Sequence, residues 1–347
     1  MLETKGSRLS AKLKKIIHRT LHQLGIETSS IYIHNSSPQE VYSGYTEDDF
    51  ATLRSFADSE ANIDTLHYTD GFGVKTLFEC VPFVSFQTLN LRLLEFPVPD
   101  DGFHAETIEY VALTDALSRS RLDRGFCAVE IGAGWGPWIT AAGVIARKNG
   151  CKAIKLVGVE ASTNRFHLMC RHLEVNDLRP LSTAIIEDVQ YGNIFSRLFK
   201  GAVWTHDGTV WFPKADITDM GSAASALNEQ TDYRGAKTEN LQVPCRRLDT
   251  LLNDLGVINF MHIDIQGAEL ELLQNQIEWM SNNVQTLMIA THSRTIEGKL
   301  IELLFDRGWQ LHREKPCRAN WYMNCSITGK TIVDGSQYWL NRNIIKC

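Results

Sequence analysis

The segment from Val129 to Gly136 has the residue types and spacing of a nucleoside-binding turn. An apolar run ends in Glu130, and glycines follow at positions 132, 134 and 136. Glycines at such a turn allow backbone angles that a Cβ would oppose, and they let a ligand lie directly against the main chain. A second apolar run ends in Glu160, whose carboxylate can accept hydrogen bonds from both hydroxyls of a ribose.

The spacing of the glycines indicates which nucleoside to expect. A dinucleotide site reads G-x-G-x-x-G and leaves a helix N-terminus free to hold a pyrophosphate. Here the pattern is G-x-G-x-G, with Glu130 two residues before it. Because no pyrophosphate needs to be held, the pattern favours S-adenosylmethionine, with its amino-acid end on the turn and its ribose on Glu160. An ordinary tight turn is the alternative.

Asp264 is a second acidic residue at the end of a predicted strand. Ligands of open α/β sheets bind outside the carboxyl ends of the strands, so we expect Asp264 in the same crevice as Glu130. There it would lie near the methyl donor or on a cation, and N-capping of the next helix is the alternative. For Glu269, in the first turn of that helix, a structural role on the helix dipole is as well supported as a functional one.

His292 leaves the next apolar strand at the same edge. The pKa of an imidazole lies near working pH, and one ring nitrogen can take a hydroxyl proton as the oxygen attacks a methyl group. We therefore predict that His292 is the general base, assisted by Asp264, with capping of the following helix as the alternative. His262 lies inside a strand and is predicted to be a hydrogen-bonded core residue.

These side chains need an α/β scaffold. Strands separated by helices imply a parallel sheet with helices on both faces. The predicted strands are 126–131, 154–160, 257–264 and 284–291, and the predicted helices are 105–119, 136–149, 163–176, 266–280 and 294–307. Segment 201–212 is predicted to be a strand, a turn at Asp207-Gly208 and a returning strand. Segments 309–313, 320–327 and 330–333 are predicted as strands of an antiparallel closing edge.

The length of 347 residues favours one catalytic domain with an N-terminal extension. We place the accessory region at 1–104 and the catalytic domain at 105–347, with the polar stretch 215–240 as a lid-like loop. Residues 9–24 have the periodicity of a basic amphipathic helix. Such a helix can pack on the domain, join a second subunit in a homo-oligomer, or touch a membrane surface.

Composition narrows the classes of partner. A net charge of −6 and a pI near 6.0 argue against a nucleic-acid partner. No apolar run approaches the ~20 residues of a membrane span, and the N-terminus lacks the apolar core of a secretion signal. The eight cysteines form no C-x-x-C pair, which is typical of reduced core thiols. The chain is therefore predicted to be cytoplasmic and to act on a small-molecule or glycan acceptor.

Five segments in this order resemble the FkbM-like family of S-adenosylmethionine-dependent methyltransferases. They are 129–136, 157–162, 202–212, 247–252 and 262–271, and the resemblance covers roughly Glu106 to Pro316. It implies a class I (Rossmann-like) fold with a seven-stranded sheet, and methyl transfer to a hydroxyl of a sugar, glycan or natural product. The predicted cofactor-binding residues are Glu106, Thr107, Glu130, Gly132, Ala133, Gly134, Trp135, Gly136, Glu160, Ala161, Thr205 and Asp264.

The sequence departs from the family pattern in two places. Gln266 replaces a Glu of the strand-end motif, which weakens the case for a metal site there, and Gly-Ala-Gly-Trp-Gly replaces Gly-Ala-Asn-x-Gly. Trp135 would shape the methionine end of the cofactor site, whereas Trp138 is predicted to be core. We expect in-line displacement in a dry pocket.

Three alternatives remain open at this stage. One is Mg²⁺ on Asp264, polarising a vicinal diol of the acceptor. A second is an S-adenosylmethionine-binding subunit or scaffold without catalysis. The third is an NAD(P)-dependent oxidoreductase, which would share the fold but predicts G-x-G-x-x-G and a Tyr/Lys pair that the sequence lacks at the expected place.

Overall fold

The computed structural model describes residues 45–58, 66–81, 106–181, 187–214, 221–231, 237–322 and 328–345. The predicted basic helix at 9–24 lies outside these residues. The described part of the chain belongs to one compact unit, Gly44–Cys347, which includes helix α3 (Glu47–Ser55) and strands β1 (His67–Thr69) and β2 (Lys75–Leu77). The boundary at residue 104 stays a prediction.

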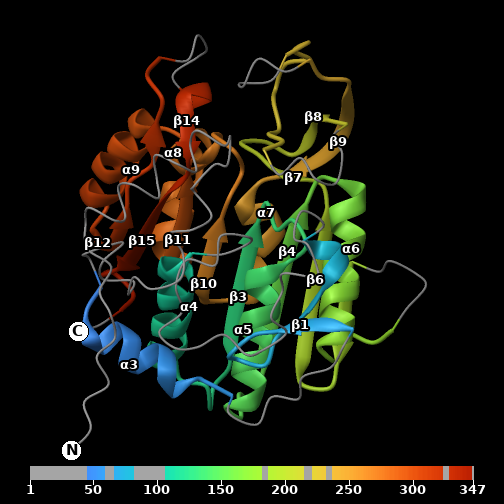
Figure 1. Ribbon diagram of the computed structural model, residues 1–347, viewed down its shortest axis with the longest axis vertical. Coiled ribbons are helices and arrows are strands. Elements are labelled where there is room, and N and C mark those ends of the chain that lie inside the picture. Colours follow the sequence, from blue (N-terminus) through green and yellow to red (C-terminus); the bar gives the residue numbers. More distant parts are fainter. Residues whose placement is uncertain are drawn as a thin grey trace, which may run out of the picture. The chain divides into compact units, whose positions relative to one another are not determined.

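A sheet of eight strands lies at the centre of this unit (Figure 1). Its order is β12-β15-β11-β10-β3-β4-β6-β5. The five inner strands β11, β10, β3, β4 and β6 are parallel, whereas β15, β12 and β5 pair antiparallel. The strands are β3 (Phe126–Ile131), β4 (Ile154–Glu160), β5 (Asp188–Tyr191), β6 (Ile194–Lys200), β10 (Ile258–Ile263), β11 (Val284–Thr291), β12 (Trp309–Lys315) and β15 (Gly335–Asn341).

Helices cover both faces of the sheet. One layer holds α4 (Thr107–Arg119), α5 (Pro137–Lys148) and α6 (Thr163–Val175), and the other holds α7 (Leu248–Leu252), α8 (Glu269–Asn283) and α9 (Arg294–Asp306). Successive side chains of a strand point to opposite faces. Accordingly, Val129 of β3 joins the core cluster of α8 and α9, whereas Glu130 points to α5. The predicted α/β fold class is confirmed.

The sheet contains one strand more than the seven predicted. The extra edge strand β5 pairs with β6, whose alternating Ile194, Ser196 and Leu198 are buried on one face. At the other end, β15 lies between β11 and β12 and carries the pairing expected of the closing edge. Of the three predicted edge segments, 309–313 falls within β12, and 320–327 lies outside the described residues except for 320–322, which form no strand. Segment 330–333 falls on the short β14 (Thr331–Val333), which pairs with β13 (Arg318–Ala319) outside the main sheet.

A three-stranded sheet stands at the carboxyl ends of the parallel strands (Figure 1). Its strands are β7 (Ala202–Val203), β8 (Gly208–Pro213) and β9 (Asn240–Arg246). The prediction of a hairpin within 201–212 is wrong, because β9 inserts between the two strands. Cys245 of β9 faces Ala202 on one side and Gly208 on the other, so the backbone groups of β7 and β8 pair with β9 instead of with each other.

The described cysteines, 80, 127, 151, 170, 245 and 317, are buried free thiols, in line with the predicted reduced state. Short 3-10 turns complete the fold at η2 (Phe78–Cys80), η3 (Asn253–Leu255) and η4 (Thr328–Lys330). Within the described ranges, none of the helices is both long enough and apolar enough to traverse a lipid bilayer.

Candidate active site

The glycine turn connects β3 to α5. Gly132, Gly134 and Gly136 have φ angles of 74°, 57° and 71°, in the left-handed region that favours glycine. A Cβ on Gly132 would lie 1.8 Å from the carbonyl oxygen of Asp264. Gly132 therefore allows the ends of β3 and β10 to approach each other, while Gly134 is free to line a pocket.

Glu160 ends β4 beside this turn. Its carboxylate accepts hydrogen bonds from the backbone N–H of Gly134 at 2.7 Å and of Ser162 at 2.6 Å. The side chain is buried, and burial raises the pKa of Glu160, partly offset by the two amides and by the charge of Arg165. The acid is thus held against the glycine turn by two backbone donors, with lone pairs left for a ligand.

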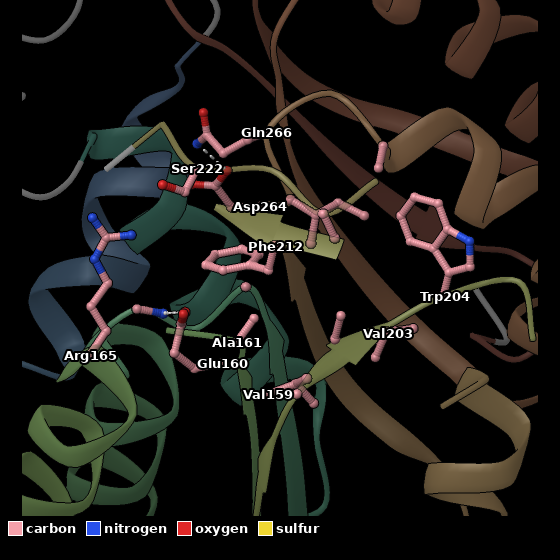
Figure 2. A pocket seen from close by; sticks show the side chains of 17 residues that line it. Val159, Glu160, Ala161, Arg165, Val203, Trp204, Phe212, Ser222, Asp264 and Gln266 are labelled. Carbon is pink, nitrogen blue, oxygen red and sulfur yellow. Dashed lines mark hydrogen bonds between the residues drawn. The ribbon is translucent and has the colours of Figure 1, made fainter. Parts of the chain in front are cut away.

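A pocket opens at the carboxyl ends of β3, β4 and β10 and beneath the small sheet (Figure 2). Glu160 lies on one wall and Asp264 on the opposite one, with the ring of Phe212 between them in the view. The lining residues are Gly132, Gly134, Val159, Glu160, Ala161, Arg165, Gly201, Ala202, Val203, Trp204, Phe212, Ser222, Ala224, Asp264, Ile265, Gln266 and Ala268.

Asp264 follows β10 and presents a side chain that is 35% exposed. Gln266 has a φ of 57°, rare for a residue with a Cβ, and its Nε2 donates to Asp264 Oδ1 at 2.8 Å. Ala268, not Asp264, is the N-cap of α8, so the capping alternative is excluded. The strained loop instead aims Asp264 into the pocket.

His292 lies behind Asp264 and is 2% exposed. Its Nε2 is 3.3 Å from Asp264 Oδ1 and its Nδ1 is 2.9 Å from Glu269 Oε1, although neither contact has the angle of a straight hydrogen bond. Burial opposes a charge on the ring, but the carboxylates of Glu269 and Asp264 outweigh it and raise the pKa of His292 well above the usual value. Ser293 caps α9, so the capping alternative for His292 is excluded as well.

Glu269 holds the far side of the imidazole. Its side chain is fully buried and accepts hydrogen bonds from the backbone N–H groups of Ile265 and Gly267. Asp264, His292 and Glu269 therefore form a carboxylate–imidazole–carboxylate chain with one end in the pocket. One ligand atom from each lies within 4.8 Å of the others, so these three residues can also hold a cation.

Several predicted cofactor residues lie outside the pocket lining. Trp135 is buried in a cluster with Leu77 and Leu168, and Ala133 donates its backbone N–H to the Val159 carbonyl. Gly136 is the N-cap of α5. For these residues a role toward the cofactor stays a prediction.

Glu106, Thr107 and Thr205 are also outside the lining. Glu106 pairs with Lys315 and accepts a hydrogen bond from Ser336, beside the carboxyl end of β11, and Thr107 is fully buried at the start of α4. The carbonyl of Thr205 accepts a hydrogen bond from Arg247. This arrangement neither shows nor excludes a contact of these three residues with the cofactor, so their role stays a prediction.

Glu130 is buried and accepts the backbone N–H groups of Trp138 and Ile139 at the start of α5. Burial raises its pKa from 4.5 to about 8, so in the folded protein the carboxyl keeps its proton at neutral pH. A carboxyl group whose pKa is raised in the folded state stabilises the fold at pH values below the pKa of the unfolded chain. This stabilisation is lost as the pH rises from 4.5 to about 8.

Replacing Glu130 with Gln keeps an acceptor oxygen but removes the titration. Between those two pH values we expect the free energy of unfolding of the wild type to fall relative to that of Glu130→Gln, by up to ~1.4 kcal/mol per pH unit. Denaturant unfolding at a series of pH values measures the difference. Parallel curves for the two proteins would show that Glu130 is ionised in the folded state.

Sequence reasoning missed part of the pocket. Arg165, Phe212 and Ser222 line it, as does the segment from Gly201 to Trp204. The available signal was the strand end at Lys200, because residues after a parallel strand lie at the ligand-binding edge. The core interpretations were correct: His262 is buried with its Nε2 3.0 Å from Glu109, and Trp138 packs on Tyr110.

Comparison with known proteins gives one family. The methyltransferase FkbM domain matches residues 130–310. A curated protein of Jannaschia sp. (strain CCS1), named "Putative methyltransferase", is 28% identical over 290 residues, which are 82% of this chain and 95% of that protein.

Two solved structures match part of the chain at low identity. Precorrin-6y C5,15-methyltransferase from Geobacter metallireducens GS-15 is 14% identical with a TM-score of 0.34, over 71% of this chain and 93% of that one. Fibrillarin from Aeropyrum pernix, solved with natively bound S-adenosyl-L-methionine, is 11% identical with a TM-score of 0.33, over 66% and 74%.

Proposed function

The chain belongs to the FkbM-domain methyltransferase family, and on that premise we propose that it methylates a hydroxyl group of a sugar, glycan or natural product. The observation that carries the proposal is the opposition of two acidic groups across one pocket. Glu160 is suited to a nucleoside on one wall, and Asp264 leads to a buried imidazole on the other. The pocket therefore offers a place for a methyl donor and an acceptor of protons.

The residues present fit S-adenosylmethionine, the methyl donor that the family implies. Glu160 is oriented by two backbone amides and would hold the ribose, while Gly134 leaves room at the turn for the amino-acid end. When bound, the donor supplies an electrophilic methyl group, which passes to the acceptor oxygen as the sulfonium becomes a thioether. Phe212 and Trp204 line the pocket with aromatic rings, which would restrict water around a bound donor and so strengthen electrostatic interactions there.

Asp264, His292 and Glu269 provide a path for the proton that leaves the acceptor hydroxyl. Asp264 is the member that reaches the pocket, and His292 Nε2 lies directly behind it. We assign His292 as the base that finally holds the proton, with Asp264 between it and the acceptor. Glu269 orients the ring and stabilises the imidazolium, as a buried carboxylate does for a catalytic histidine.

Metal assistance is the main alternative for the same residues. Asp264, Glu269 and His292 lie close enough to share a cation. However, Mg²⁺ prefers an all-oxygen set, whereas His292 would offer nitrogen, and Glu269 already accepts backbone hydrogen bonds. The donor set therefore favours proton transfer over a magnesium site.

The proposal includes a cytoplasmic location and association with a second subunit or another partner. Free buried cysteines support a reducing compartment such as the cytoplasm. Association through the predicted helix at 9–24, in a homo-oligomer or with another partner, stays a prediction. A binding subunit without catalysis would keep the Glu160 wall of the pocket but would not need His292.

The variant Glu160→Ala tests whether Glu160 binds the ribose of the cofactor. Loss of hydrogen bonds to a charged group should weaken S-adenosylmethionine binding by roughly 2–3 kcal/mol, while the fold is kept. Isothermal titration calorimetry of the variant, the wild type and the exposed-site control Asp123→Ala measures this effect. An unchanged affinity of Glu160→Ala would move the ribose elsewhere, and binding of NAD in preference to S-adenosylmethionine by the wild type would support the oxidoreductase alternative.

A further inference from the structure

Asp334 is a further charged group beside His292, outside the chain of three residues described above. Its Oδ2 is 3.9 Å from His292 Nε2, the same ring nitrogen that lies 3.3 Å from Asp264 Oδ1. Asp334 follows the segment 130–310 that matches the family domain, so the family match assigns it no role. Nε2 thus has two carboxylate neighbours, and of these two Asp264 is the one that lines the pocket.

The pairing of β15 with β11 brings Asp334 to the imidazole. β15 runs antiparallel beside β11, with Gly335 opposite Thr291 (Figure 1). Continuing this register by one residue sets Asp334 opposite His292, and side chains of directly opposed residues lie on the same face. Thr331, on the other side of Asp334 in the chain, donates its hydroxyl to the His292 carbonyl at 2.7 Å. Contacts on both sides therefore fix the position of Asp334.

Gly335 allows this close approach of the two chain segments. A Cβ on Gly335 would collide with Thr291 Oγ1 and with Glu297 Oε1. Glu297 is buried and accepts hydrogen bonds from the Thr291 hydroxyl at 2.9 Å and from the Cys317 backbone N–H at 2.6 Å. Moving these groups aside would cost buried hydrogen bonds. The start of β15 is therefore held against the end of β11, and Asp334 is held with it.

Asp334 differs from the other groups around the ring in its exposure to solvent. Its side chain is 58% exposed, whereas those of His292 and Glu269 are 2% and 0% exposed. Asp264 is 35% exposed but lines the pocket, so a bound donor and acceptor would cover it. While the pocket is filled, Asp334 is therefore the member of this group of four that keeps contact with bulk water.

We propose that Asp334 is the outlet for the proton that His292 takes up. The inference rests on the proposed function and names the residue that returns its base to the neutral form. Methyl transfer from a sulfonium to a hydroxyl releases one proton, which would pass through Asp264 to His292 Nε2. The Nε2–H bond then breaks, the proton passes to an oxygen of Asp334 and from there to water, and the imidazole is ready for the next turnover.

The groups around the ring fit this direction of transfer. Glu269 Oε1, 2.9 Å from Nδ1, favours a proton on that nitrogen and leaves Nε2 to gain and lose protons. Partial burial raises the pKa of Asp334; the charge of His292 opposes this effect, and those of Asp264 and Glu269 add to it. A raised pKa makes the carboxylate a better proton acceptor. One bridging water or a rotation of the exposed side chain would close the gap of 3.9 Å.

Exchange of the ring protons with water tests the outlet without an acceptor. The full-length protein is labelled with ¹⁵N-histidine and saturated with S-adenosylhomocysteine, and the signals missing from His292→Ala identify the ring. At about pH 6 the ring should carry both protons, because the pKa of His292 is raised well above its usual value. Exchange of the Nε2 proton should be slower by about tenfold or more in Asp334→Asn, and Asp334→Glu should restore it.

Asp306→Asn is the matched control. Asp306 is an exposed carboxylate at the last residue of α9, about 20 Å along the helix from His292. Its loss should leave the exchange of the ring protons unchanged. An exchange rate in Asp334→Asn equal to that of the wild type would overturn the inference, and so would the same slowing in Asp306→Asn.

A separate assay of methyl transfer distinguishes the two levels of the account. Slower exchange in Asp334→Asn, in a protein that methylates nitrogen or carbon, would reject the proposed function but support Asp334 as the outlet of His292. Methylation of a hydroxyl, together with exchange that does not depend on Asp334, would support the function and overturn the outlet.

Discussion

Gly134→Val should abolish S-adenosylmethionine binding, with a loss of affinity on the order of 100-fold or more. Gly134 has a φ of 57° and lines the pocket, and its N–H donates to Glu160 at 2.7 Å. A valine would fill the space beside the turn and would pull this donor away from the carboxylate. Calorimetric titration measures the loss.

Gly192→Val is the matched control, because the backbone cost should be similar. Gly192 has a φ of 60°, and a Cβ there would meet no atom within 4 Å. Both variants should lose about 1–2 kcal/mol of stability from the strained φ, but only Gly134→Val should lose the cofactor. Equal, wild-type affinity in both would show that the turn is structural and that the cofactor binds elsewhere.

His292→Ala should lower turnover by about 10²–10⁴-fold, the range supplied by a general base. The affinity for S-adenosylmethionine should change little, since His292 does not line the pocket. Single-turnover rates measured at saturating methyl donor give the effect directly. Because the variant leaves Glu269 buried without the ring, thermal unfolding must show that the protein is folded at the assay temperature.

The pH dependence of the rate separates a base from a structural residue. The neutral imidazole is the form that accepts a proton, so the wild-type rate should rise with pH through a pKa above 6.5. Glu269→Gln removes the nearest carboxylate and should shift this rise to lower pH. If His292→Ala keeps full activity while Asp264→Asn loses it and added Mg²⁺ proves essential, the metal-assisted alternative is the better account.

The parallel core could be predicted from the sequence because its strands and helices alternate. The predicted strands 126–131, 154–160 and 284–291 coincide with β3, β4 and β11. Their residues are mostly apolar, since both faces of the sheet are covered by helices. Glu160, Asp264 and His292 each follow or end a predicted parallel strand, so the sequence predicted that they lie at one edge of the sheet. Asp264 and His292 are in contact at that edge.

Features that depend on long-range pairing could not be predicted. The strand β9 separates β7 from β8 and comes about 30 residues later in the chain, so local turn chemistry at Asp207-Gly208 pointed to a hairpin that does not form. The burial of His292 and its contact with Glu269 also depend on how the loop after β10 folds. The left-handed Gln266 of that loop had no signature in its sequence.

The most direct test of the account incubates the protein with S-adenosylmethionine carrying a ¹³C-labelled methyl group and with glucose, mannose and galactose tetrasaccharides as trial acceptors. NMR of the purified sugar then identifies the atom that carries the label. The account predicts an O-methyl signal on the sugar from the wild type and its loss in His292→Ala and in Glu160→Ala. Label on nitrogen or carbon of another acceptor class, or cofactor binding without transfer to any hydroxyl, would contradict it.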